Sequence, residues 1–104
     1  MSKSNETVHL RLFVAGTGSD SAEAIKNLDQ LKAEGLANDS IVEIIDIKEE
    51  PDLALENMVI VVPMLVMEAP EPKVTIIGSL SDTTKVWAAL RIYPKELQHA
   101  KSPA

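Results

Sequence analysis

The most apolar run of the chain is Val59-Ile60-Val61-Val62-Pro63-Met64-Leu65-Val66-Met67, and apart from Pro63 every side chain in it is large and hydrophobic. A short uncharged run of this kind is typical of a central strand that is buried on both faces. Proline has no backbone N–H to donate to a sheet, so it belongs at the start of a strand or at a bulge. We therefore predict a strand over residues 63–67, with residues 59–62 as a buried approach to it. The Val62-Pro63 bond is a candidate cis peptide.

Length and composition favour one α/β domain over residues 1–104. A core of about residues 8–93 would carry flexible tails at residues 1–7 and 95–104. The chain has one Phe, one Tyr and one Trp, so this core must be largely aliphatic. It has no cysteine, which excludes disulfides, thiolate metal sites and thiol redox chemistry.

The charge balance bears on the partners that the chain can have. The net charge is −6 and no basic run is present, which argues against binding to a nucleic-acid backbone. The polar N-terminus lacks the apolar core of a signal peptide, and no stretch approaches the roughly 20 apolar residues that span a membrane. We expect a cytoplasmic protein with neither a membrane nor a nucleic-acid partner and without a cofactor.

Upstream of the central run, the pattern predicts two strands joined by a helix. Residues 8–14 and 41–47 are rich in β-branched and aliphatic side chains, as in strands. Between them, apolar residues at helical spacing predict a helix over residues 21–34, with Asp20 as its N-cap and Glu23 completing a capping box. A helical connection of this kind makes the two strands parallel.

Downstream, a short helix is expected over residues 51–57 and a further strand over residues 73–77. The last helix would be capped by Ser81 and ended or kinked by Pro94. Its apolar face would consist of Val86, Ala89, Leu90 and Tyr93. The predicted order is β-α-β-α-β-β-α, with parallel crossovers first and an antiparallel hairpin last.

This order is that of the thioredoxin-like fold, which also places a proline at the start of its third strand. Redox members of that fold carry Cys-x-x-Cys where the first helix begins, because the helix dipole lowers the pKa of a thiol there. The corresponding stretch in this chain is Thr17-Gly18-Ser19-Asp20-Ser21. A redox enzyme is therefore excluded.

Two further patterns have competing interpretations. Gly16 and Gly18, with Asp46 near the end of the next strand, resemble part of a dinucleotide-binding fingerprint; the missing third glycine favours a turn instead. An acidic cluster lies around the short second helix. Its carboxylates either cap the helix and face solvent, or they form a docking surface for a basic partner. Its members are Glu49, Glu50, Asp52 and Glu56.

His9 and His99 lack metal-ligand spacing, and no nucleophile–base pair can be assembled, so we do not expect an enzyme.

Six segments, in this order, resemble the KaiB family of bacterial clock proteins. They are Leu10-Arg11-Leu12-Phe13-Val14-Ala15-Gly16, Ala24-Ile25-Lys26-Asn27-Leu28, Ile45-Asp46-Ile47, Pro51-Asp52-Leu53-Ala54, Val62-Pro63-Met64-Leu65 and Ile76-Ile77-Gly78-Ser79-Leu80-Ser81. The resemblance implies a non-catalytic regulator that works with a KaiC-type ATPase ring, together with a KaiA-type regulator. The chain also resembles the KaiB-like sensor domain of a clock histidine kinase, although no kinase follows within these 104 residues.

The resemblance further implies two folds of one chain, a tetrameric resting fold and a thioredoxin-like fold that binds the ring. The part from about Pro51 onward rearranges, and the cis or trans state of a proline-rich region differs between the folds. Here that region contains Pro63, Pro70 and Pro72. The docking surface on the ring is expected to use Ile47, Lys48, Glu49, Pro51 and Leu53.

Two departures in the last helix favour the thioredoxin-like fold at rest. Family members often carry glycine at the position of Ala89 and an acid at that of Arg91. Alanine is a better helix former than glycine by roughly 1 kcal/mol, and two folds of one chain differ by only a few kcal/mol. We therefore expect a monomer or small homo-oligomer with a helical C-terminal segment.

Other departures concern the partner. Clock KaiB proteins carry basic residues on their partner surfaces, whereas this chain has Glu23, Glu43, Met58, Val74 and Thr75 at positions where such charge is expected. Changes of this kind alter partner choice and association rate. A thioredoxin-like adaptor in a signalling or stress circuit is therefore the alternative to a KaiC-binding protein, and a small nucleotide-binding enzyme is a remote third.

Overall fold

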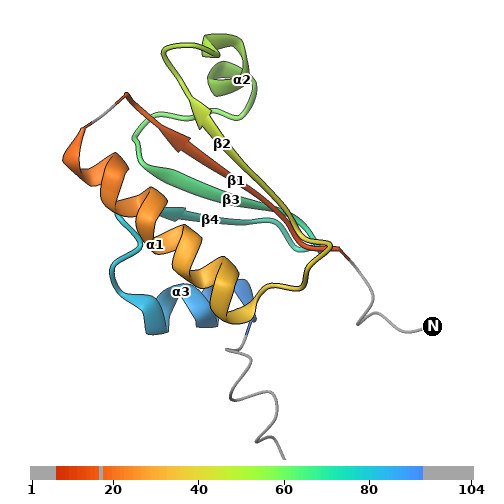
Figure 1. Ribbon diagram of the computed structural model, residues 1–104. Helices are drawn as coiled ribbons and strands as arrows, with labels where there is room; N and C mark the ends of the chain where they lie inside the picture. Colours follow the sequence, from red (N-terminus) through yellow and green to blue (C-terminus); the bar gives the residue numbers. More distant parts are fainter. Residues whose placement is uncertain (1–6, 17, 93–104) are drawn as a thin grey trace, which may run out of the picture.

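The computed structural model describes residues 7–16 and 18–92. Seven elements follow one another along the chain (Figure 1): β1 His9–Val14, α1 Ser19–Gly35, β2 Ile41–Asp46, α2 Pro51–Glu56, β3 Met64–Ala69, β4 Val74–Ile77 and α3 Thr83–Leu90. This is the predicted order of strands and helices. Tyr93, Pro94, His99 and the C-terminal tail lie outside the described residues, as does the N-terminal tail before Thr7.

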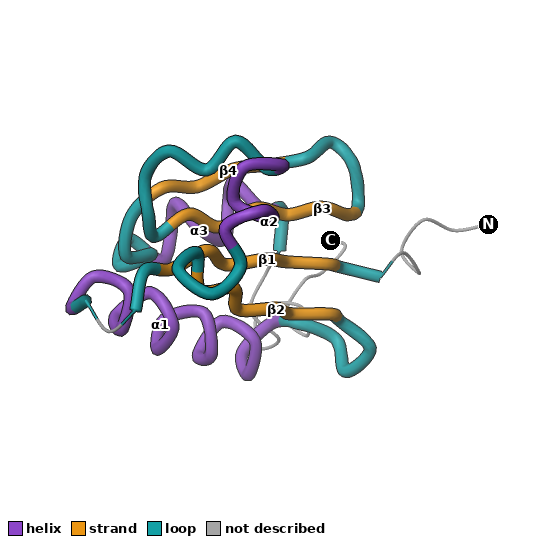
Figure 2. Tube along the Cα trace, turned by 90° about the horizontal axis from the view of Figure 1, so that it is seen from above, coloured by secondary structure: helices purple, strands orange, loops and turns teal. Residues whose placement is uncertain are grey.

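The four strands form one mixed sheet in the order β2-β1-β3-β4 (Figure 2). β1 and β2 are parallel, and β3 and β4 form an antiparallel hairpin, as the sequence predicts. β3, however, is antiparallel to β1, so the prediction of a parallel crossover into the third strand is wrong.

The direction of β3 follows from the shortness of α2. A helix of six residues is about 9 Å long, whereas a six-residue strand spans about 20 Å. α2 is therefore too short to span the sheet by itself, and it stays at the end where β2 finishes (Figure 1). β3 begins at that same end and runs in the opposite direction to β1.

Two hydrophobic cores lie on opposite faces of the sheet. The first is covered by α1 and α3 and includes Leu10, Leu12, Ala24, Leu28, Leu65, Met67, Val86 and Leu90. The second contains Phe13, Ile45, Met64 and Val66. Side chains alternate across a strand, so Leu65 and Met67 face α1 and α3 while Met64 and Val66 face the other side. β3 is thus buried on both faces, as predicted.

The approach to β3 differs from the prediction. Val59 and Val62 are half-buried, but Ile60 and Val61 are exposed. Pro63 is buried and precedes the strand, which begins at Met64; its carbonyl accepts a hydrogen bond from Gly78 N at 2.9 Å. The peptide bonds before Pro63, Pro70 and Pro72 are cis.

Both predicted helix caps are displaced by one or two residues. α1 begins at Ser19 with Gly18 as its N-cap, because Ala22 N already donates to Gly18 O at 2.9 Å, and Asp20 lies within the first turn. At α3 the N-cap is Asp82 and not Ser81. The Asp82 carboxylate accepts a hydrogen bond from Lys85 N at 3.3 Å.

The segment expected to be helical at the C-terminal end is helical within the described residues. Ala89 lies in the last turn of α3, and Arg91 follows as the C-cap with φ 58° and ψ 40°, in the left-handed region. Its backbone N–H donates to Ala88 O at 3.1 Å and so satisfies a carbonyl at the end of the helix. Glycine adopts this conformation with less strain than any other residue.

Replacing Arg91 with glycine is therefore expected to raise the free energy of unfolding by about 1 kcal/mol. Ala89→Gly should lower it by up to about 1 kcal/mol, because glycine is a poor helix former. Urea-induced unfolding followed by tryptophan fluorescence measures both effects. A destabilised Arg91→Gly variant would show that the arginine side chain contributes more than its backbone conformation costs.

Candidate docking surface

The five residues predicted to dock on a partner form one stretch that leads from the end of β2 into α2. Lys48, Glu49 and Pro51 are exposed there. Ile47 and Leu53 are half-buried and pack against the second core. The structure thus gives the stretch two roles: Ile47 and Leu53 attach it to the sheet, whereas the other three face solvent.

Asp46 fixes the start of this stretch. Its Oδ1 accepts hydrogen bonds from Lys48 N at 2.9 Å and from Gly16 N at 3.4 Å. Its carbonyl accepts from Glu49 N at 3.0 Å and Glu50 N at 2.9 Å. The Asp46 carboxylate therefore serves the local backbone, in place of the ribose contact that a dinucleotide site requires.

Gly16 is a turn residue with φ +60°, a conformation in which other residues are strained. A Cβ at Gly16 would lie 3.3 Å from Lys48 Nζ, so the lysine side chain lies directly over the glycine. Gly18 has φ −58°, an ordinary value for any residue. These observations favour the interpretation as a turn over the nucleotide-binding alternative.

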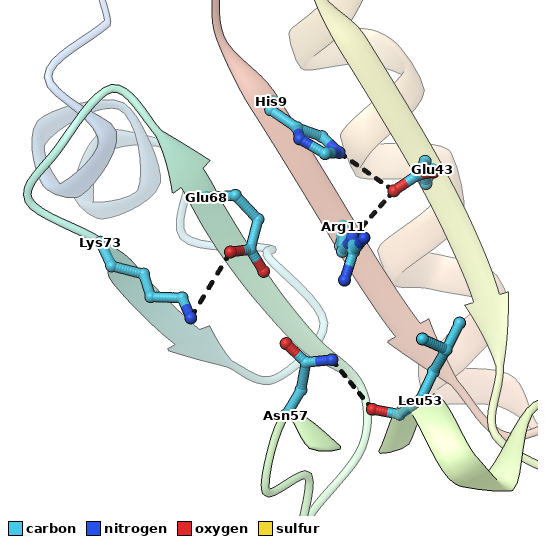
Figure 3. Close-up of polar contacts among 7 residues, drawn as sticks. All are labelled: His9, Arg11, Glu43, Leu53, Asn57, Glu68 and Lys73. Carbon is cyan, nitrogen blue, oxygen red and sulfur yellow. Dashed lines mark hydrogen bonds and ion pairs between the residues drawn. The ribbon is translucent and has the colours of Figure 1, made fainter. Parts of the chain in front are cut away.

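The far end of α2 is held by Asn57. The carbonyl of Leu53 accepts hydrogen bonds from Asn57 N at 3.0 Å and from Asn57 Nδ2 at 2.9 Å (Figure 3). Val59 N donates to Ala54 O at 2.9 Å. These bonds tie the segment after α2 back onto the helix.

Sequence reasoning missed a group of exposed apolar side chains at this end of the molecule. We call Leu55, Met58, Ile60 and Val61 the α2 patch; their exposed fractions are 77%, 77%, 88% and 46%. The exposure of Ile60 and Val61 could not be predicted from the sequence, because the neighbouring residues in the run are also apolar. Leu55 had a detectable signal, because on so short a helix Leu53 alone is sufficient as the buried anchor. Clustered exposed apolar side chains are characteristic of interaction surfaces.

Met58 is also strained. Its φ is 55°, in the left-handed region that residues other than glycine rarely adopt. Most of its side chain is exposed, so core packing does not explain why methionine occupies this position. This conformation ends α2: Met58 N donates to Leu55 O at 3.0 Å and Val59 N donates to Ala54 O at 2.9 Å, a left-handed helix end that glycine usually forms.

Exposed carboxylates precede the α2 patch in the sequence, and one lies between its first two members. Glu49, Glu50, Asp52 and Glu56 are all exposed, and the structure gives none of them an ion pair within the residues that it describes. An apolar surface with an acidic rim is complementary to an apolar surface with a basic rim. This arrangement favours the docking interpretation of the acidic cluster.

A different set of charges occupies the open part of the sheet, on the face of the second core. His9 Nε2 lies 3.0 Å from Glu43 Oε1, and Arg11 Nε donates to the same oxygen at 2.9 Å (Figure 3). Lys73 Nζ lies 3.4 Å from Glu68 Oε1. The hydrogen bonds from His9 and Arg11 lower the pKa of the Glu43 carboxyl below its ordinary value.

This shift predicts a pH dependence of stability. The folded-state pKa of Glu43 is lowered, so its contribution is present above the ordinary carboxyl pKa and is lost as the pH falls through the folded-state pKa. Between about pH 6 and pH 3 the wild type should lose more stability than Glu43→Gln. Urea titrations at each pH measure this difference, with Glu23→Gln, an exposed acid on α1, as the control. Identical profiles for the wild type and Glu43→Gln would refute the prediction.

Across residues 7–16 and 18–92, no cluster of three or more His, Cys, Asp or Glu side chains is arranged to hold a metal ion. In the same residues no helix has the length and apolarity needed to cross a bilayer.

Comparison with known proteins identifies the family of the chain. The sequence model of the KaiB domain matches residues 11–92, which is most of the chain. The chain belongs to the KaiB family. Circadian clock protein KaiB3 of Synechocystis sp. is 40% identical over 86% of this chain and 87% of that protein. Circadian clock oscillator protein KaiB of Cyanothece sp. is 33% identical over 100% of this chain and 99% of that protein.

Solved structures show the fold. The N-terminal domain of Synechococcus elongatus SasA has a TM-score of 0.64 and 24% identity, covering 81% of this chain and 83% of that one. The thioredoxin of Malassezia sympodialis has a TM-score of 0.67 and 19% identity, covering 82% of this chain and 73% of that one. The predicted resemblance to KaiB and the thioredoxin-like fold class are both confirmed.

The five departures from KaiB charge are dispersed over this fold. Glu23 is exposed on α1, Thr75 is exposed on β4 and Val74 is half-buried there. Glu43 is bonded to His9 and Arg11, and Met58 belongs to the α2 patch. Of the five, Met58 therefore lies in the candidate docking surface.

Proposed function

We propose that this KaiB-family chain is a non-catalytic cytoplasmic regulator that docks on a KaiC-type ATPase ring and modulates its output. The contact would be made by the α2 patch together with Lys48, Glu49 and Pro51. The observation that carries the proposal is the exposure of the apolar side chains of the α2 patch on a well-bonded segment. Ile47 and Leu53 would hold this surface in position by packing against the second core.

The chemistry of this surface indicates what the ring must offer. The exposed apolar side chains need an apolar counterpart, since burying them supplies most of the affinity. The surrounding carboxylates need basic residues, which would steer the encounter and select this chain over KaiB proteins with basic partner surfaces. A KaiC-type ring with a basic rim around an apolar pocket therefore fits best.

The free chain would already hold the docking fold. The thioredoxin-like arrangement, with α3 helical, is the form that the family resemblance assigns to ring binding. Ala89 would favour that form through its helix propensity. Pro63, Pro70 and Pro72 retain, as part of this proposal, the conformational role that the resemblance implies, and a KaiA-type regulator or histidine kinase would be a second partner.

Met58 gives a prediction in which stability and binding move in opposite directions. Met58→Gly is expected to raise the free energy of unfolding by about 1 kcal/mol, since glycine relieves the positive φ and the lost side chain is exposed. The same change should weaken docking, because it removes an apolar side chain from the surface. Urea unfolding and ring titration measure the two effects. Unchanged ring affinity would remove Met58 from the proposed contact.

The proposal is tested by gel filtration of the chain with a KaiC-type ATPase from the same genome, with and without ATP. Saturable co-elution with the ring is the expected result, and a KaiB relative that binds its own ring serves as the positive control. If the relative co-elutes and this chain does not, the docking proposal fails. The thioredoxin-like adaptor then becomes the better account.

A further inference from the structure

A small cavity lies between side chains of α1 and α3. These two helices cover the sheet face away from the second core (Figure 1). The volume of the cavity is about 120 Å³. Leu31 and Val86 form apolar walls, and the half-buried Trp87 contributes an aromatic one. Drug-sized ligands and nucleotides need sites of roughly 300 Å³ or more, so this cavity accommodates only a small group such as the head of a side chain.

Two amide side chains at the cavity are held by hydrogen bonds. Asn27 Nδ2 donates to Ser79 O at 2.8 Å, and Gln30 Nε2 donates to Glu34 Oε2 at 3.0 Å. The first bond leaves Asn27 Oδ1 as an acceptor, and the second orients the Glu34 carboxylate with Oε1 still able to accept. The cavity therefore offers acceptor oxygens on Asn27 and Glu34, and Glu34 is its one charged lining residue.

We propose that this cavity binds a guanidinium group. Guanidinium is planar, permanently charged and carries five N–H donors, so it can stack on an indole while donating to several acceptors at once. Trp87 supplies the indole, Glu34 the countercharge and Asn27 a neutral acceptor. The net charge of −6 adds a long-range attraction for cations. This site is separate from the α2 patch and does not depend on the proposed function.

Trp87 provides a direct measurement, because the chain contains one tryptophan. We would titrate N-acetyl-arginine amide while recording tryptophan fluorescence and the indole N–H resonance in a ¹⁵N correlation spectrum. N-acetyl-citrulline amide, which has nearly the same shape without the charge, is the matched ligand control. The expected result is a saturable change with the arginine compound and a much weaker change with the citrulline compound.

The residue test uses Glu34→Gln with Asp29→Asn as its matched control. Asp29 is an exposed acid on the same helix and does not line this cavity. Glu34→Gln should weaken binding about tenfold or more, since it removes a charge-assisted hydrogen bond, whereas Asp29→Asn should have little effect. If both variants weakened binding equally, the binding would be due to general charge attraction, and the proposed guanidinium site would be wrong. Equal binding of the citrulline compound, or no saturation by either readout, would also overturn it.

A further comparison distinguishes a free metabolite from a protein side chain. Free arginine carries an α-ammonium and an α-carboxylate, which a blocked arginine lacks, as does an arginine within a protein. Tighter binding of the blocked compound would assign the cavity to an arginine of a protein partner, and tighter binding of free arginine would assign it to a free guanidino compound.

Discussion

Replacing Leu65 with alanine is expected to lower the free energy of unfolding by about 2–5 kcal/mol. Leu65 is fully buried in β3, where it packs in the core that α1 and α3 cover. Removing its side chain would leave a cavity that the surrounding aliphatic residues fill only in part. Urea unfolding followed by tryptophan fluorescence measures the loss.

The matched control is Ile77→Ala in the neighbouring strand. Ile77 is 60% exposed at the edge of the same sheet, so its truncation should change stability by only about 0.5 kcal/mol. If the two variants lost equal stability, β3 would not be the centre of the fold. A difference of several kcal/mol would establish that it is.

Ile60→Asp is expected to weaken binding to the KaiC-type ring at least about 30-fold, the loss typical of an interface hot spot. Ile60 is the most exposed member of the α2 patch, at 88%. Aspartate would add a further negative charge to an acidic rim and remove the apolar contact. The affinity would be measured by titrating labelled chain with ring.

Ile60→Asp should leave the free energy of unfolding nearly unchanged, because so exposed a side chain contributes little to the fold. Ile77→Asp is the control for binding, since it places the same charge at an exposed isoleucine on β4. Equal affinity of the Ile60 and Ile77 variants would show that the α2 patch is not the contact. If Ile60→Asp did not fold, Met58→Gly would be the variant that tests whether the α2 patch contacts the ring.

The fold was predictable where local pattern and burial agree. The uncharged run around Leu65 predicts a strand buried on both faces, and the structure places Leu65 in one core and Val66 in the other. The helix between the first two strands predicts their parallel pairing, which is observed. In each case neighbouring residues carry the information that fixes the element.

The prediction was wrong where the outcome depends on distant parts of the chain. The direction of β3 is set by the shortness of α2 and by where that helix lies, and the apolar pattern of the strand does not encode either. Ile60 and Val61 belong to the same apolar run as Leu65, yet they are exposed. Hydropathy alone cannot distinguish an apolar residue kept for packing from one kept for a partner.

The candidate site shows the same division. The resemblance to KaiB predicts docking by the stretch from Ile47 to Leu53, but the sequence did not separate the two half-buried residues of that stretch from the exposed ones. It also gave no indication that Met58 has a positive φ. That property depends on how the chain leaves α2, where Asn57 and Val59 bond back to the helix.

The central claim is that the free chain already holds the fold that docks on the ring. The most direct test is the association rate of labelled chain with increasing concentrations of the KaiC-type ring, measured by rapid mixing. We predict a single phase whose rate rises linearly with ring concentration, as expected when the binding-competent form is the resting form. A rate that reaches a plateau independent of ring concentration would mean that a change of fold limits binding, and it would contradict the account.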